Sequence, residues 1–306
     1  MKSSTRNWLA ALIVAASAGG AGASAERPGL IAASLDAGER AKLAGEVERA
    51  RRETPQAFAN LAAIGGVRPE VYMRTRARRP EATRDLRRLG PSGLWPMLEV
   101  AALRGFPPQR ALSDGERLAL ERGLVEVLGE LGDARAIPVL RAALVGGAND
   151  RAVEEGAAVA LGKLCGEREL RLLIDLSRAG DARRASAIAG LGQCRQIAAA
   201  ERLAAIAGER DAGAAEAAVR ALGTIGSSWA WATGSAGDAA TGERIRAIAA
   251  QAMVRAGASG AVPVERVAPE LSLLDAPSVA NAIAAERARA DGAALERLDR
   301  LAPTRR

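Results

Sequence analysis

The dipeptide Leu-Gly recurs four times in the middle of the chain at a nearly constant period. The spacings are 33, 30 and 31 residues, and each copy closes a run of helical periodicity: Leu128-Gly129, Leu161-Gly162, Leu191-Gly192 and Leu222-Gly223. Self-similarity at this period is typical of proteins that stack one small structural unit many times. The repeat therefore predicts one domain made of similar units with short-range contacts.

Each unit has the pattern of two helices. In one of them, Ser113 to Glu116 has the sequence of a capping box, and apolar residues follow at helical spacing as far as Leu128. Gly129 to Gly132 is expected to end this helix, and Asp133 to cap a second one over residues 134–145. Aromatic residues make up only 2% of the chain, so Ala, Leu, Val and Ile must fill the core. This composition favours closely packed helices, and we expect an all-α fold.

The pattern extends beyond the four Leu-Gly copies. Residues 151–180 and 181–210 repeat the two-helix plan. The stretches LGPSGLWPML (residues 89–98) and AGASGAVPVE (residues 256–265) place Gly, Ser, Gly and Pro at matching positions. We expect these two stretches to share one turn design, since proline is tolerated in the first turn of a helix.

These features resemble HEAT-like repeats of the kind also found in phycobilin lyases. The shared pattern is a first helix ending in Leu-Gly, a short turn often written Gly-Asp, and a second helix with an early proline, as in AIPVL. The similarity covers roughly residues 81–275, about six units. The resemblance implies a right-handed α-solenoid whose second helices line the concave face, and it carries over no functional residue.

The flanks are less regular. Residues 26–80 are predicted to form N-terminal capping helices, one over 34–53 and one starting at Thr54-Pro55, and residues 276–306 a C-terminal cap with one polar helix from Ser278 to Leu301. Caps are needed because a terminal repeat would otherwise leave an apolar face open.

Residues 1–25 have the three-part plan of a secretory signal peptide. Lys2 and Arg6 precede an apolar run from Trp8 to Ala18, and the small-residue triplet 23–25 precedes Glu26. An apolar run of about eleven residues is too short to span a bilayer of about 30 Å. We expect cleavage after Ala25 and a soluble, periplasmic or secreted bacterial protein without a transmembrane segment.

The composition disfavours an enzyme. The chain has no histidine, which removes the commonest general base and the usual zinc ligand. No Gly-rich phosphate loop follows a strand, and no hydrolase motif is present. We expect no catalytic, cofactor-binding or metal-binding residues.

The two cysteines, Cys165 and Cys194, fall in equivalent turns of neighbouring units. Cys194 occupies the slot three residues after the Leu of Leu-Gly, and Cys165 stands one position further on in its own unit. Stacking places such turns side by side, so a disulfide is the favoured interpretation, consistent with an oxidising compartment. Two independent buried thiols, or a reactive or metal site, are the alternatives.

Residues 227–244 break the repeat where the fifth unit should have its second helix. They hold Trp229 and Trp231, followed by a Gly/Ser-rich loop. Tryptophans on an insertion are good anchors for glycans or peptides. The structural alternative is that Trp229 fills the gap left by a shortened helix.

An arginine cluster lies between residues 68 and 88, where the first unit begins. It comprises eight cations: Arg68, Arg74, Arg76, Arg78, Arg79, Arg84, Arg87 and Arg88. Such a patch could contact an anionic polymer or surface, or be simply a solvated face of an arginine-rich protein. Nucleic acid is disfavoured, because the chain is predicted to be exported and Tyr72 is the one interleaved aromatic residue.

Together these features predict a non-catalytic scaffold for a protein partner in the bacterial cell envelope. Binding is expected on the concave face and at the Trp229 segment. The alternative is a glycan- or small-ligand-binding protein that uses Trp229 and Trp231.

Overall fold

The computed structural model describes residues 30–31, 34–64, 81–104, 113–146, 150–178, 180, 183–233 and 238–301. Within these ranges every regular element is a helix. The elements are α1 (Ala37–Glu53), α2 (Pro55–Ala62), α4 (Glu81–Arg88), η1 (Gly90–Gly93), α5 (Leu94–Ala102), α6 (Asp114–Leu131), η2 (Ala134–Ala136), α7 (Ile137–Val145), α8 (Arg151–Leu164), α9 (Glu167–Arg178), α10 (Arg183–Leu191), α11 (Ile197–Ala207), α12 (Ala212–Gly226), α13 (Ser228–Thr233), α14 (Ala239–Ser259), α15 (Val264–Leu271), α16 (Ala276–Arg287) and α17 (Gly292–Leu301). The predicted signal peptide, residues 1–25, lies outside the described residues.

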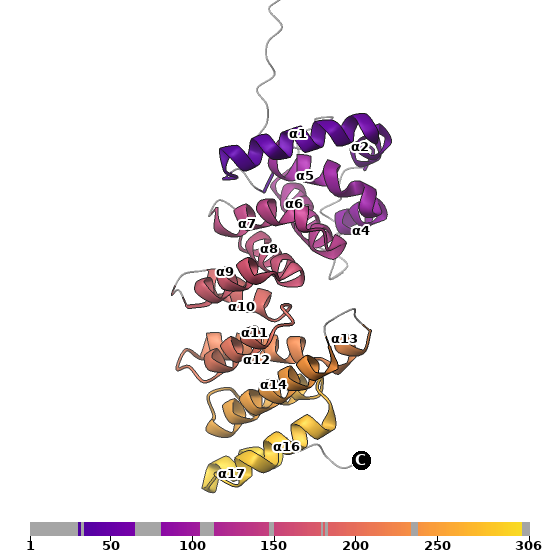
Figure 1. The fold of residues 1–306 in the computed structure, drawn as a ribbon. Coiled ribbons are helices and arrows are strands. Elements are labelled where there is room, and N and C mark those ends of the chain that lie inside the picture. The colour runs from indigo at the N-terminus through magenta and orange to yellow at the C-terminus, as the bar shows by residue number, and fades with distance from the viewer. Residues whose placement is uncertain are drawn as a thin grey trace, which may run out of the picture.

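The helices stack into an α-solenoid, as expected. Figure 1 shows one column with α1 and α2 at one end and α16 and α17 at the other. We call the first helix of each unit the A helix (α4, α6, α8, α10, α12) and the second the B helix (α5, α7, α9, α11). No helix in the described part of the chain is both long and apolar enough to cross a membrane.

The Leu-Gly glycines bring neighbouring A helices into close contact. Gly129 and Gly162 lie inside α6 and α8 rather than in the turns that follow, so within the expected break at residues 129–132 the helix ends at Gly132 and not at Gly129. A Cβ atom on Gly129 would come 2.6 Å from the Cβ atom of Ala160 on α8, and one on Gly162 would overlap the carbonyl oxygen of Gly190 on α10. The glycine of each Leu-Gly pair therefore allows two neighbouring A helices to approach closely. Helix α6 itself ends at Gly132, whose φ is 66°.

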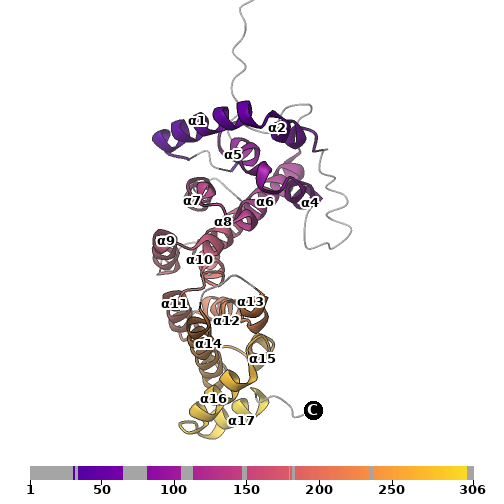
Figure 2. The same ribbon diagram turned by 45° about the vertical axis from the view of Figure 1, so that its right-hand side comes forward.

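The column curves toward its A helices. Consecutive A helices pack directly on one another, whereas the B helices α7, α9 and α11 contact one another little. Figure 2 shows the middle A helices set back between α4 at one end and α13 and α15 at the other. The concave side is thus lined by the A helices, and the implied placement of the second helices there is wrong.

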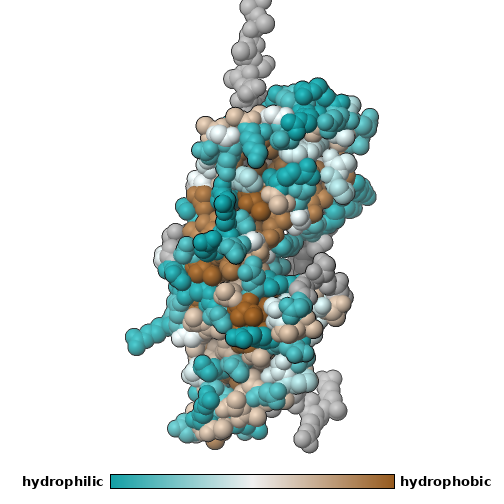
Figure 3. Space-filling model, in the orientation of Figure 1, coloured by the Kyte–Doolittle hydropathy of each residue, from teal (hydrophilic) through white to brown (hydrophobic). Residues whose placement is uncertain are grey.

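Hydrophobic residues reach the surface over α7 to α9 in Figure 3.

The fifth unit has a B helix after all. Gly223 of α12, the last Leu-Gly glycine, packs against Glu270 of α15, so α15 occupies the next A position. Helix α14 packs on both α11 and α12 and serves as the fifth B helix. The segment with α13 is therefore an insertion between the two helices of this unit, and it does not replace a helix as we expected.

The expected shared turn design and the expected single C-terminal helix are both wrong. Residues 256–265 connect a B helix to the next A helix, whereas residues 89–98 connect an A helix to its B helix. Gly90 has φ 56° within η1, but its sequence match Gly257 lies inside α14, so the two stretches do not share a turn design. The expected single C-terminal helix is divided into α16 and α17 before Gly292, whose φ is 36°.

Candidate interaction surface

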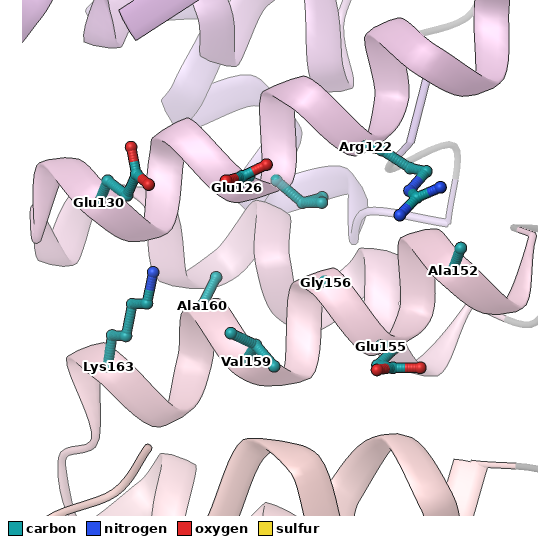
Figure 4. Close-up of a pocket in the computed structure, with 10 residues that line it drawn as sticks. Arg122, Glu126, Glu130, Ala152, Glu155, Gly156, Val159, Ala160 and Lys163 are labelled. Carbon is teal, nitrogen blue, oxygen red and sulfur yellow. The ribbon is translucent and has the colours of Figure 1, made fainter. Parts of the chain in front are cut away.

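A groove runs along the inner side of the column between the A helices α6 and α8. Its volume is about 280 Å³. Figure 4 shows the lining residues of the two helices, with the Lys163 side chain extending toward Glu130: Arg122, Glu126 and Glu130 come from α6, and Ala152, Glu155, Val159 and Lys163 from α8. The walls thus combine cationic and anionic groups with a small apolar floor.

The floor is shallow because small residues let the two helices approach. Gly156 of α8 faces Val125 of α6, and a Cβ atom on Gly156 would come 2.6 Å from a Val125 methyl carbon. Ala160 lies one turn further along α8, against Gly129. The side chains that project beyond this floor are consequently the charged ones, which gives the groove its polar rim.

Arg87 of α4 holds the two acidic residues of the α6 wall. Its Nε donates to the Glu130 carboxylate at 2.5 Å, and one terminal nitrogen lies 3.3 Å from Glu126. These contacts raise the pKa of Arg87, chiefly through the hydrogen bond to Glu130. The inner face therefore continues as a charged network from α4 onto α6.

The described members of the arginine cluster have acidic partners. Arg88 and Arg84 lie 3.0 and 3.7 Å from the Asp85 carboxylate, and Arg87 pairs with Glu126 and Glu130. These three arginines fit the solvated, ion-paired alternative. The remaining members lie outside the described residues: Arg68, Arg74, Arg76, Arg78 and Arg79.

Side chains in the turns after the A helices link neighbouring units. Cys165 and Cys194 form the predicted disulfide, with Cα atoms 5.4 Å apart. Cys194 is fully buried, and the amide nitrogen of Gln196 donates to the Cys165 carbonyl at 2.8 Å. In the first two units, the Arg135 guanidinium lies 4.8 Å from the centre of the Trp95 ring. This edge of the column is therefore fastened across unit boundaries.

Trp231 fastens the inserted segment to the column. Its indole Nε1 donates to the Ile225 carbonyl at 2.7 Å, and its ring lies against Gly242 of α14, where a Cβ atom would come within 2.8 Å. The Arg195 guanidinium lies 5.5 Å from the ring centre. Trp231 is therefore the packed ring of the segment, whereas the structural alternative assigned the packed role to Trp229.

Trp229, in contrast, faces solvent. It is 75% exposed. The neighbouring Ser228 N–H donates to the Leu273 carbonyl at 2.9 Å, and Leu273 is itself 43% exposed. The start of α13 and the turn after α15 therefore lie side by side, and each carries an exposed apolar side chain, Trp229 and Leu273.

The described residues offer little for catalysis or metal binding. No group of three or more acidic or cysteine side chains among them is arranged to hold a metal ion. Glu121 is buried on α6, and burial raises its pKa to about 7, opposed by Arg117 and assisted by Asp150. This environment lies within the helix packing, so we interpret the shift as structural.

The sequence reasoning missed the groove between α6 and α8. Its signal was available, because Arg122, Glu126 and Glu130 recur every four residues on one face of α6. What the spacing could not supply was the direction of that face, which depends on how the column curves.

Comparison with known proteins supports this architecture. Residues 109–192, which span α6 to α10, match the family model described as HEAT repeats. None of the curated proteins matches the chain. The matched segment contains the groove between α6 and α8, Cys165 and three of the four Leu-Gly copies, and it ends two residues before Cys194.

Proposed function

We propose that this protein is an exported, non-catalytic HEAT-repeat scaffold that binds a protein partner along the inner face of its column. HEAT repeats generally mediate protein–protein interaction, and the match at residues 109–192 supports that general role here. The observation that carries the proposal is the groove between α6 and α8, whose charged rim of both signs lies on the concave side. Such a surface suits electrostatic matching to a specific partner.

The insertion supplies a second contact point. Trp229 is held on a helix that Trp231 anchors, so its exposed ring needs little ordering when a partner binds. Large, rigid aromatic side chains of this kind are common anchors at protein interfaces. We therefore assign Trp229 and Leu273 to the same interaction surface as a peripheral apolar anchor.

The cell envelope is the proposed location. The signal-peptide pattern in residues 1–25 and the disulfide between Cys165 and Cys194 both support export, because disulfides persist in oxidising compartments. N-terminal sequencing of the protein from an envelope fraction should begin at Glu26. Recovery of the uncleaved chain in the cytoplasm with two free thiols would contradict this location.

A pull-down from envelope extract tests the scaffold role. We expect one stoichiometric protein partner, lost when Glu155 and Lys163 are exchanged in charge by the double substitution Glu155→Lys and Lys163→Glu. The matched control exchanges a surface pair on the B helix α9, Glu167→Arg and Arg171→Glu, which should leave the partner bound. Loss in both variants, or in neither, would contradict the inner-face assignment.

A glycan- or ligand-binding role is the second candidate, and the exposure of Trp229 favours it. Exposed indole rings can anchor sugar rings by stacking. The test compares the binding of purified peptidoglycan or polysaccharide by the native protein and by Trp229→Ala. Trp229 is chosen because Trp231→Ala would also disturb the fold. Polysaccharide binding lost in this variant, with no protein partner recovered from the native protein, would replace the scaffold role.

A further inference from the structure

A second cavity lies away from the inner face, beneath the N-terminal helix α1. Its volume is about 520 Å³, within the range of small-molecule sites. Helix α1 forms one wall, and the turn and start of α7 form another, while Trp95 of α5 closes one side. The three elements come from the N-terminal cap and the first two units, so the cavity depends on the way the cap crosses the column.

The interior of this cavity is apolar. Leu43 and Val139 are buried there, and Leu35 and Pro138 extend the same surface. The Trp95 ring is held in place by the Arg135 guanidinium, 4.8 Å from its centre. A ligand would consequently meet a preformed apolar and aromatic wall.

One cation at the mouth of the cavity, Lys42, forms no ion pair with any described residue, although Glu39 and Glu46 lie three and four residues from it on α1. Glu39 pairs with Arg141 of α7, and Arg135 forms two hydrogen bonds to the Asp133 carboxylate at 2.9 and 2.5 Å. The second lining acid, Glu46, lies 3.1 Å from Arg49. Among the charged residues that line the cavity, Lys42 alone has no ion-pair partner within the described part of the chain. Its ammonium group is exposed on α1.

We propose that this cavity binds a small molecule with an apolar body and a single anionic group, such as a medium-chain carboxylate. The alkyl chain lies against Trp95, Leu43 and Val139, and the carboxylate pairs with Lys42. Such a ligand can contact the apolar wall and also pair with Lys42, whereas a neutral or cationic amphiphile can contact only the wall. The site is separate from the proposed partner-binding face, so either can fail without the other.

Calorimetric titration of the purified protein with decanoate tests the site. We expect saturable 1:1 binding, at least about tenfold stronger than that of decanol or decyltrimethylammonium, since a charge-assisted contact commonly contributes this much. Lys42→Gln should weaken decanoate binding about tenfold. Arg52→Gln removes another exposed cation of α1 that does not line the cavity, and should leave binding unchanged.

A second variant locates the ligand. Ala134 lines the cavity at an exposed position, so Ala134→Trp should fill the space without disturbing the core, and should abolish decanoate binding while circular dichroism stays native. Absence of binding to the native protein would overturn the proposal. Equal affinity for decanoate and decanol, or undiminished binding in Ala134→Trp, would do the same.

Discussion

Gly162 of α8 lies directly against the backbone of Gly190 on α10, so that any side chain at position 162 would overlap the Gly190 carbonyl oxygen. This contact explains why a Leu-Gly pair recurs along the chain. The leucine fills the core, and the glycine lets the next A helix approach. Closer spacing on the A side than on the B side then bends the column and creates its inner face.

Gly162→Ala should accordingly destabilise the protein. The added methyl group meets backbone rather than a movable side chain, and overpacking of this kind costs about 1 to 3 kcal/mol. Gly45→Ala is the matched control, because Gly45 lies inside α1 with nothing within 4 Å of the new Cβ atom and should gain about 0.5 to 1 kcal/mol. Urea denaturation measures both, and equal effects in the two variants would contradict the close-contact interpretation.

Reducing the disulfide should weaken the junction between the third and fourth units. A crosslink over a separation of 29 residues is worth about 3 to 4 kcal/mol in the chain-entropy model. We expect the urea midpoint to fall when reductant is added, and non-reducing mass spectrometry to show the Cys165–Cys194 linked peptide. Two alkylatable thiols in protein purified from the envelope would contradict both results.

The two tryptophans of the insertion should respond differently to truncation. Trp231→Ala removes a half-buried ring and its hydrogen bond to Ile225, and should cost about 2 kcal/mol or more. Trp229→Ala should change stability by less than about 0.5 kcal/mol, because the ring is mostly in solvent. Thermal unfolding separates the two, and equal losses of stability would show that Trp229 is also part of the packing.

Glu121 should make stability depend on pH. Burial raises its pKa to about 7 in the folded protein, against about 4.5 for an ordinary glutamate, so the folded state binds more protons between these values. Stability therefore falls as pH rises through this window. Glu121→Gln should raise the melting temperature at pH 8, with a smaller gain at pH 5. The exposed control Glu155→Gln should show no such difference, and a gain for Glu121→Gln that is independent of pH would contradict the shift.

Much of the architecture was predictable, because the repeat specifies both the helical period and the stacking. The Leu-Gly copies gave the number and order of units in the middle of the column, and the cysteine slots gave the disulfide. The register of the fifth unit was not predictable from composition, because Gly, Ser and Pro occur both in turns from an A helix to its B helix and in turns from a B helix to the next A helix. Residues 89–98 and 256–265 therefore match in sequence although they are different kinds of turn. The packing of α15 on α12, with Gly223 against Glu270, identifies α15 as the next A helix.

The candidate surface was harder to predict than the fold. Trp229 and Trp231 are two residues apart, and on a short helix two such positions face different directions, so one is anchored and the other exposed. The sequence pattern identified the segment but assigned the structural role to the wrong ring. Which helices line the concave side could not be predicted either, because the curvature depends on the spacing between helices and not on the sequence of any one helix.

Site-specific photocrosslinking tests the central claim, that the inner face binds a protein partner, most directly. A photoreactive phenylalanine is placed at Glu155 in the groove between α6 and α8, and in a separate variant at Arg171 on the outer helix α9, both exposed positions. Irradiation in the cell envelope should give one discrete protein adduct from position 155 and none from position 171. An adduct from position 171 alone, or identical adducts from both, would contradict the account.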